Sequence, residues 1–308
     1  MKAEREWLAG WAPAKINLWL AVHGRRADGY HELDTVMLST SLADELRVRT
    51  SQEEGIALTV DGPQASADIP ADERNLVFRA ARAVLDLAVE EGHKVPPGLQ
   101  IQLTKNVPSQ AGLGGGSSDA VTTMRLIEQL LKFDLSQEWS SSFLENLGAD
   151  CAFFDSASAS GLALCSGVGE IVTPIPGAPP AWTIAVLVPD VPCPTGSVFS
   201  ALDLDESERR HAPQFANLDA NSVRRSLHND LESAAIRCEP TLKNWRELFD
   251  QSEAAHFCMS GSGSSFFGIY DSNDRAQVDL DRLICLAQAA GMDLRGNFLC
   301  EVTALGER

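Results

Sequence analysis

The chain has 308 residues, of which 44% are hydrophobic, and a formal net charge of −18 at pH 7. This length predicts two domains of ordinary size, each able to bury a core. The negative charge argues against nucleic acid or an anionic membrane as the main partner, because both require clustered lysine and arginine. An anionic small molecule remains compatible, provided that local donors, a helix N-terminus or a metal ion offset the overall field.

The cysteines and the N-terminus indicate a reducing compartment. The seven cysteines are far apart and contain no C-x-x-C pair, which fits neither a disulfide framework nor a zinc site. The N-terminal segment MKAEREWLAGWAPAK lacks the apolar core of a signal peptide, and no run approaches the roughly 20 apolar residues of a membrane span. We therefore expect a cytoplasmic protein with neither a membrane nor a nucleic-acid partner.

Hydrophobic periodicity predicts both strands and helices in the first half of the chain. The apolar segment 15–24 is typical of a strand, and residues 34–50 continue with strand-like segments. Residues 75–92 have the apolar face of a helix that ends at Gly92, and residues 98–107 alternate like a half-buried strand. A helix is expected after the glycine-rich segment that follows, with Ser117 or Ser118 as its cap. Another helix is expected over 137–147.

The composition shifts toward glycine and proline over residues 161–180, so we place the domain boundary there, with domains at 1–160 and 161–308. Beyond it, the pattern predicts a strand at 183–189 and a helix that starts after Pro240. A strand, a turn and a strand are expected over 255–270, then a helix closed by Gly291 and a last strand over 296–305. Both halves mix helices and strands, which indicates an α/β or α+β protein.

The segment PSQAGLGGGSSDA, residues 108–120, is expected to bind an anion. Glycine permits close backbone approach to a ligand, and a helix N-terminus presents free N–H groups and the positive end of a dipole. A strand, a glycine loop and a helix in series most often bind phosphate. The P-loop pattern fails because no lysine follows Gly116, and the dinucleotide pattern fails because Ser117 stands at its last glycine position. The alternative is a flexible glycine turn before a helix.

The loop resembles the nucleotide loop of the GHMP family of small-molecule kinases, through Pro108, Gly112, Leu113, Gly114, Ser117 and Ser118. The segments APAKINL at 12–18 and MSGSGSSFFG at 259–268 are similar to the first and third motifs of that family. The resemblance covers nearly the whole chain. It implies an α+β fold with a ribosomal-protein-S5-like N-terminal domain, a ferredoxin-like C-terminal domain and an active site in the cleft between them. It also implies ATP and Mg²⁺ as cofactors. We expect a monomer or a weak homodimer.

One branch of the family is especially similar to this sequence. GRRADGYHELDTV at 24–36, GADCAFF at 148–154, CPTGSVFSAL at 193–202 and HNDLE at 228–232 occur in the expected order. That branch uses ATP to phosphorylate the 2-hydroxyl of 4-diphosphocytidyl-2-C-methyl-D-erythritol, in the non-mevalonate (methylerythritol phosphate) route to isopentenyl diphosphate. The chain departs from the branch at Cys151-Ala152, where a Val-Pro pair is usual. The alternatives are a kinase for another acceptor, such as mevalonate or homoserine, a silent nucleotide-binding sensor and a dinucleotide oxidoreductase.

The resemblance assigns catalytic roles to Lys15 and Asp150. A carboxylate near the acceptor hydroxyl helps it to lose its proton, and a paired lysine orients that carboxylate and lowers the pKa of the hydroxyl. A lysine inside an apolar segment is costly unless it is paired or functional. The alternatives are a turn aspartate and a strand-end lysine that reaches solvent. Asn17 shares the strand face of Lys15 and is expected to contact the substrate, with a purely structural asparagine as the competitor.

The resemblance also implies the residues of the ATP site. Asn75 and Lys105 match positions that line the adenine pocket, and their alternative roles are a helix N-cap and a surface lysine. The loop amides and serine hydroxyls would hold the phosphates, with Ser117 and Ser118 as candidate Mg²⁺ ligands. The expected loop contacts are Pro108, Ser109, Gln110, Ala111, Gly112, Leu113, Gly114, Gly115, Gly116, Ser117 and Ser118.

The cytidine end of the substrate is assigned in the same way. Tyr30 and His31 follow a turn signal, and such side chains can stack on a base and bond its edge. Phe199 matches the aromatic residue on the other side of the base, and Thr195 is a weaker candidate. The alternatives are an amphipathic surface pair and a core phenylalanine. Near the phosphates we expect a turn of Gly261, Ser262 and Gly263, for which a tight hairpin is the alternative.

Overall fold

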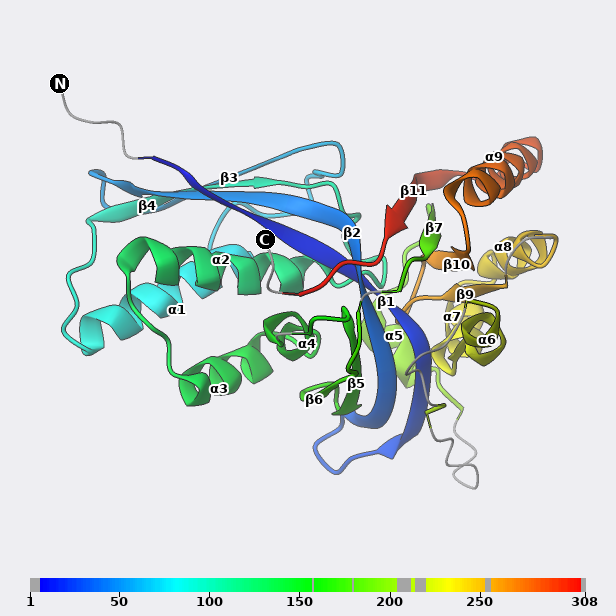
Figure 1. Ribbon diagram of the computed structural model, residues 1–308, viewed down its shortest axis with the longest axis horizontal. Helices are drawn as coiled ribbons and strands as arrows, with labels where there is room; N and C mark the ends of the chain where they lie inside the picture. The colour runs from blue at the N-terminus through cyan, green and yellow to red at the C-terminus, as the bar shows by residue number, and fades with distance from the viewer. Residues whose placement is uncertain are drawn as a thin grey trace.

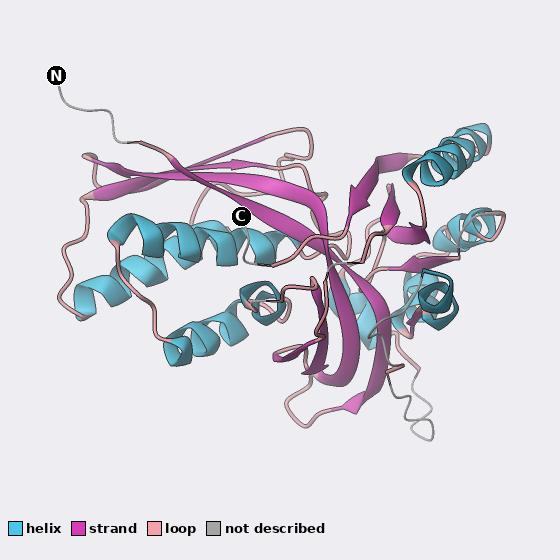
Figure 2. Cartoon of the chain, viewed as in Figure 1, coloured by secondary structure: helices cyan, strands magenta, loops and turns pink. Residues whose placement is uncertain are grey.

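The computed structural model describes residues 6–156, 158–178, 180–203, 212–213, 220–252 and 256–305. Two layered bodies lie next to each other along the long axis, each with a sheet and helices (Figures 1 and 2). The larger body contains the elements drawn from blue to mid-green, and the smaller one most of the later elements, drawn from light green through yellow to red (Figure 1). No helix of the described ranges is long and apolar enough to cross a bilayer.

Within the described residues, the larger sheet has the order β3-β4-β2-β1-β8, with β5 added on β2 and β6 on β5. Long antiparallel strands β1 and β2 form its spine, and helices α1 to α4 cover one face (Figure 1). The strands are β1 (Leu8–Arg25), β2 (His31–Ser51), β3 (Gly55–Asp61), β4 (Gly98–Thr104), β5 (Leu162–Gly167), β6 (Ile171–Pro174) and β8 (His228–Asn229). The helices are α1 (Leu76–Glu90), α2 (Gly115–Leu131), α3 (Gln137–Leu147) and α4 (Cys151–Asp155).

The smaller sheet has the order β11-β7-β10-β9 over the part of the chain that the structure describes. Its strands are β7 (Thr183–Pro189), β9 (Phe257–Met259), β10 (Phe266–Tyr270) and β11 (Leu294–Glu301). The helices of this body are α5 (Thr195–Ser200), α6 (Ala220–Ser226), α7 (Leu231–Cys238), α8 (Leu242–Phe249) and α9 (Asn273–Ala289).

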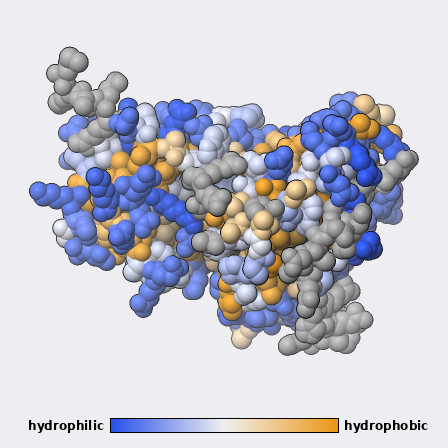
Figure 3. Space-filling model, in the orientation of Figure 1, coloured by the Kyte–Doolittle hydropathy of each residue, from blue (hydrophilic) through white to orange (hydrophobic). Residues whose placement is uncertain are grey.

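Three clusters of buried apolar side chains hold these layers together. One lies between the larger sheet and helices α1 to α4, and another between the smaller sheet and helices α7 to α9. The third joins the two bodies, because it packs Ile16 and Leu38 of the larger sheet and Leu113 of the glycine loop with Val186 and Phe267 of the smaller sheet. The glycine loop is therefore anchored in the core between the bodies. In Figure 3 the visible face is largely hydrophilic, and apolar residues show between the charged ones.

Most of the predicted elements are confirmed, and two details differ. The strand at 183–189 and the helix at 137–147 have the predicted bounds. The predicted serine cap is wrong: α2 begins at Gly115, its N-cap is Gly114 in a left-handed conformation, and Ser117 and Ser118 lie inside the first turn. Strands β5 and β6 lie beyond residue 160 yet pair with the larger sheet. The domain boundary at 160 stays a prediction.

Candidate active site

Three segments that are far apart in the sequence meet at the glycine loop. The backbone N–H of Lys15 donates to the Leu113 carbonyl at 2.9 Å, so β1 is bonded directly to the loop. The Ser260 hydroxyl donates to the Gly112 carbonyl at 2.9 Å, which attaches the turn after β9 to the same loop. The N–H of Ser265 donates to the Ala111 carbonyl at 3.3 Å. The first, second and third sequence motifs thus form one continuous structure.

Lys15 and Asn17 point into this structure from one face of β1. The Lys15 ammonium donates to Asn17 Oδ1 at 2.8 Å, which confirms that the two side chains share a face. Register shifts occur in β1 on both sides of this pair, between Pro13 and Lys15 and between Asn17 and Trp19. Such bulges re-aim side chains and are common beside active sites. The amide of Asn17 in turn donates to Thr35 Oγ1 at 2.8 Å, so the amide orientation is fixed.

Asp150 faces Lys15 across the cleft. The Lys15 Nζ lies 3.4 Å from Asp150 Oδ2, and the two side chains are 4% and 27% exposed. The lysine is thus withdrawn from solvent while the carboxylate remains reachable by a ligand. Asp150 is the N-cap of α4 and has an ordinary helical backbone conformation, and Cys151 packs into the core as the first residue of that helix. Burial raises the pKa of the Cys151 thiol to about 12, so this residue is an inert core side chain.

The glycine loop has little room for side chains. A Cβ on Gly112 would lie 2.0 Å from the Ser260 carbonyl oxygen, and one on Gly114 would lie 3.0 Å from Lys15 Cγ. Both glycines have positive φ, at 75° and 70°. The loop ends at the N-terminus of α2, where the unpaired N–H groups and the helix dipole favour an anion. At the other end of the loop, the Arg295 guanidinium of β11 donates to the Ser109 carbonyl.

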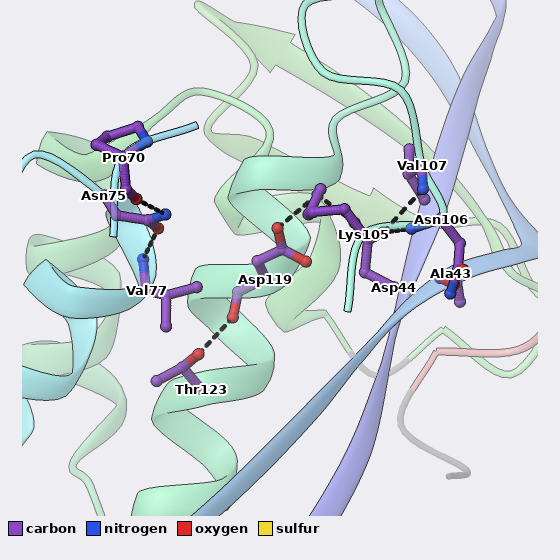
Figure 4. Close-up of polar contacts among 10 residues, drawn as sticks. All are labelled: Ala43, Asp44, Pro70, Asn75, Val77, Lys105, Asn106, Val107, Asp119 and Thr123. Carbon is purple, nitrogen blue, oxygen red and sulfur yellow. Dashed lines mark hydrogen bonds and ion pairs between the residues drawn. The ribbon is translucent and has the colours of Figure 1, made fainter. Parts of the chain in front are cut away.

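Asn75 and Lys105 occupy well-defined positions at the edge of the loop. Asn75 is the N-cap of α1, since its Oδ1 accepts from the Val77 N–H at 2.9 Å and its Nδ2 donates to the Pro70 carbonyl at 2.7 Å (Figure 4). The alternative of a surface lysine is wrong for Lys105, whose side chain is 3% exposed. Its ammonium pairs with Asp44 and Asp119 instead (Figure 4).

A cavity of about 640 Å³ brings most of the predicted residues together. It is lined by Lys15, Asn17, Asn75, Lys105, Pro108, Ser109, Gln110, Ala111, Gly112, Leu113, Gly114, Gly115, Gly116, Ser117, Asp150, Thr195, Phe199, Gly261 and Ser262. Four predicted residues do not line it, and two of them, Tyr30 and His31, line an adjoining cavity instead. Ser118 borders a separate cavity of about 290 Å³, with Trp11 and Arg125. Gly263 faces Met259 and Cys193.

An adjoining cavity of about 1120 Å³ contains the residues that were predicted to hold a base. Tyr30 and His31 line it, and it shares Thr195 and Phe199 with the first cavity. The rings of His31 and Phe199 have centroids 5.2 Å apart, and Tyr30 is 65% exposed. Burial, and secondarily the charge of Arg25, lowers the pKa of His31, which favours the neutral imidazole. The two cavities therefore adjoin at shared lining residues, and the second contains the aromatic side chains of Tyr30, His31 and Phe199.

The side chains that line the first cavity carry equal numbers of positive and negative formal charges. The binding of a phosphate chain there therefore requires additional positive potential. The charged lining side chains are Lys15, Arg74, Lys105, Asp68, Asp119 and Asp150. The α2 N-terminus supplies part of the missing potential. Among the described residues, no three His, Cys, Asp or Glu side chains are grouped so as to hold a metal ion by themselves. A Mg²⁺ bound here would therefore take most of its ligands from phosphate and water, as this ion commonly does.

Four residues that support this site were not singled out in the sequence, although three of them, Thr35, Asn229 and Ser260, lie within segments that resemble the family. Asp44 accepts a hydrogen bond from the Val107 N–H, and the Ser260 hydroxyl donates to the Gly112 carbonyl. Thr35 accepts from the Asn17 amide and so orients it. Asn229 donates to the carbonyls of Met259 and Gly261, at 2.7 and 2.8 Å, and so shapes the third turn. The segment 228–232 that contains Asn229 does occur in the family's order, but that order does not indicate this contact.

The comparisons with known proteins agree with this architecture. Residues 75–161 match the GHMP kinases N terminal domain, and residues 212–286 match the GHMP kinases C terminal domain. A solved structure titled 4-(cytidine 5′-diphospho)-2C-methyl-D-erythritol kinase superposes with a TM-score of 0.76 at 32% identity, over 96% of this chain and 100% of the other. The chain belongs to the GHMP kinase family, and the two-domain α+β fold expected from the sequence is confirmed.

Within that family, the relatives named 4-diphosphocytidyl-2-C-methyl-D-erythritol kinase are similar over most of their length. The protein of Desulfotalea psychrophila is 38% identical over 84% of this chain and 84% of its own. The protein of Geobacter sulfurreducens is 38% identical over 86% of this chain and 90% of its own. A homoserine kinase structure from Cytophaga hutchinsonii has a TM-score of 0.67 at 18% identity, over 99% of this chain and 98% of that chain, which shows the shared fold alone.

Proposed function

We propose that this protein is an ATP-dependent kinase that phosphorylates the 2-hydroxyl of 4-diphosphocytidyl-2-C-methyl-D-erythritol and releases ADP. The observation that carries the proposal is the place of the Lys15–Asp150 pair. It lies beside the glycine loop, in a cavity that adjoins, at Thr195 and Phe199, the second cavity with its aromatic side chains. A long acceptor with a nucleobase at one end fits that arrangement. The names of relatives at 38% identity support the same acceptor.

In this proposal the chain contributes mainly positioning and charge, as phosphoryl transfer requires. The loop from Pro108 to Ser117 and the α2 N-terminus bind the phosphates of ATP. Asp150 accepts a hydrogen bond from the acceptor hydroxyl and then takes its proton. Lys15 keeps that carboxylate in place and stabilises the negative charge that develops on the oxygen. Asn17, fixed by Thr35, contacts the acceptor next to the reacting hydroxyl.

The remaining assignments complete the binding site. Asn75 and Lys105 border the nucleotide, and Tyr30 and Phe199 stack on the two faces of the cytosine while His31 bonds its edge. Gly261 and Ser262 form the turn next to the diphosphate. Ser117 would be a candidate ligand of Mg²⁺, which would supply positive charge that the acidic chain lacks. The described cysteines are all free thiols, which supports the cytoplasm as the compartment.

Phosphorus NMR of the purified protein with ATP and Mg²⁺ tests the reaction and the acceptor together. Parallel samples contain the cytidyl substrate, mevalonate, homoserine or no acceptor. We expect a new phosphomonoester resonance, matched by ADP, with the cytidyl substrate alone. A new resonance with mevalonate or homoserine instead would refute the acceptor and keep the kinase. ADP formation at equal rates in every sample, or in none, would refute the proposed reaction.

A further inference from the structure

A buried cluster of three charged side chains lies directly behind the glycine loop. The Lys105 ammonium donates to Asp44 Oδ2 and, at 2.7 Å, to Asp119 Oδ2 (Figure 4). The exposed fractions of the Lys105, Asp44 and Asp119 side chains are 3%, 0% and 4%. Buried ion pairs of this kind are often replaceable by apolar side chains without loss of stability. Their presence beside an anion site therefore indicates a role other than stability.

Both carboxylate oxygens of Asp44, in β2, accept hydrogen bonds. Its Oδ1 accepts from the backbone N–H groups of Asn106 and Val107, at 2.5 and 2.8 Å, and its Oδ2 accepts from Lys105. Asn106 and Val107 are the residues through which the chain leaves β4 and enters the loop at Pro108. Asp44 thus holds the entrance of the loop against the spine of the larger sheet.

Asp119 has a different and less complete set of contacts. Its Oδ2 accepts from Lys105, while its Oδ1 is buried without a hydrogen-bond partner among the described residues. Burial raises the pKa of Asp119 well above its usual value; Lys105 offsets this only in part, and the neighbouring Asp44 carboxylate adds to the rise. The contact of Asp119 with Lys105 therefore depends on one oxygen, Oδ2.

The cluster is in contact with both the loop and the cleft. A Cβ on Gly115, the first residue of α2, would lie 3.4 Å from both Lys105 Nζ and Asp44 Oδ2. Lys105 and Asp119 line the main cavity. An ammonium has three donors, and the two carboxyl groups occupy two of them. The third is left for an acceptor on the nucleotide.

We propose that Asp44 and Asp119 are positioning residues of the nucleotide site. Asp44 fixes the chain that enters the glycine loop, and Asp119 holds the Lys105 ammonium at the wall of the cleft. The proposal rests on the proposed function as a nucleotide-dependent kinase. It differs from a merely structural role because it predicts that nucleotide affinity depends on these two carboxyl groups while acceptor affinity does not.

Calorimetric binding of ADP and, separately, of the cytidyl acceptor tests the proposal on the full chain. Asp119→Ala removes one anchor of Lys105 and is expected to raise the Kd of ADP about tenfold, as the loss of one charge-assisted hydrogen bond implies. Asp119→Asn retains a side-chain oxygen that accepts from Lys105, so its Kd for ADP is expected to lie close to that of the wild type. Asp44→Asn places an N–H₂ against donors in either orientation, so it is expected to raise the Kd of ADP by more than Asp119→Ala does.

Asp279→Asn in α9 is the matched control. Asp279 is also a buried carboxylate with side-chain partners, Tyr270 and Ser252, but it lies in the smaller body. It is expected to lower Tm and leave the Kd of ADP unchanged. If Asp44→Asn does not fold, the two Asp119 variants still decide the question.

The proposal is overturned if Asp119→Ala binds ADP like the wild type, or if ADP and acceptor affinities fall together. A wild-type protein that binds ADP without turnover refutes the proposed reaction alone. One that binds no ADP overturns both proposals.

Discussion

The closest backbone approach in the site, between Gly112 and Ser260, makes a quantitative prediction for Gly112→Ala. Gly112 has a φ of 75°, where a residue with a Cβ is strained by about 1–2 kcal/mol. The new Cβ would lie 2.0 Å from the Ser260 carbonyl oxygen, whereas real Cβ atoms essentially never come within 3.0 Å, so the two loops must separate by about 1 Å. That movement also breaks the 2.9 Å hydrogen bond from the Ser260 hydroxyl to the Gly112 carbonyl.

Two consequences follow from these numbers. Strain plus one lost buried hydrogen bond amounts to about 2–4 kcal/mol of destabilisation. A displacement of about 1 Å between the parts of a catalytic site costs about 100-fold in rate. We expect Gly112→Ala to lower Tm and to lower kcat by about that factor.

Thermal unfolding and steady-state kinetics measure both effects, with Gly116→Ala as the control. Gly116 lies four residues on, in the first turn of α2, and its Cβ would be 3.6 Å from Leu76 Cδ1, in ordinary contact. Alanine within a helix is favoured over glycine by about 0.5–1 kcal/mol, so this variant should be at least as stable as the wild type. If Gly112→Ala has the kcat and the Tm of the wild type, the approach of the two loops has no part in the activity.

Three further results are expected. Asp150→Asn preserves the shape of a partly exposed side chain, so we expect an unchanged Tm. We expect kcat to fall by a factor of about 10²–10⁴, the usual range for a lost general base. A near-normal kcat in a folded variant would exclude Asp150 as the base. Because burial and Arg25 lower the pKa of His31, the KM of the acceptor should be constant near neutral pH and rise only below pH 6.5, and His31→Gln should abolish that rise. Because burial raises the pKa of Asp119, its contribution to the free energy of unfolding is complete below the ordinary aspartate pKa and decreases as pH rises toward its folded-state pKa. Chemical unfolding at several pH values should show this decrease, and Asp119→Asn should make the dependence of the free energy of unfolding on pH less steep. An equal dependence in both proteins would contradict the assignment.

The periodic elements of the fold were predictable because their residues report local geometry. Asn17 could be placed beside Lys15 from the two-residue repeat of a strand, and the hydrogen bond between them confirms it. The start of α2 was not predictable from capping preferences, since Gly114 adopts a left-handed conformation and leaves the serines inside the helix. That choice depends on the contact of the loop with Lys15 and Phe154, which only the tertiary structure supplies.

The supporting residues of the site were hidden for a related reason. Asp44 lies in a strand-like segment without a motif, and its partners Asn106 and Val107 are more than 60 residues away. Lys105 was expected from the family resemblance, but its burial could not be inferred because the lysine looked like any polar residue at the end of a strand. A charge that is satisfied by long-range partners leaves no local pattern.

The two serines of the glycine loop show how one residue of helical rotation separates two roles. Consecutive residues on an α-helix point about 100° apart, so Ser117 and Ser118 cannot both face the cleft. A Cβ on Gly148 would lie 3.1 Å from Ser117 Oγ, which places that hydroxyl beside the turn that leads to Asp150. Ser118 borders the cavity on the other side of α2, and its hydroxyl is buried without a partner among the described residues.

The serine prediction follows from this difference. Ser117→Ala should raise the KM of Mg·ATP about tenfold, because it removes a hydrogen bond to a charged ligand. Ser118→Ala should leave that KM unchanged and should not lower Tm, since it removes a hydroxyl that has no partner. Initial rates at several Mg²⁺ concentrations and thermal unfolding measure both variants. A larger effect on KM from Ser118→Ala than from Ser117→Ala would mean that α2 presents its other face to the phosphates when nucleotide binds, and the assignment of the cleft to Ser117 would then be wrong.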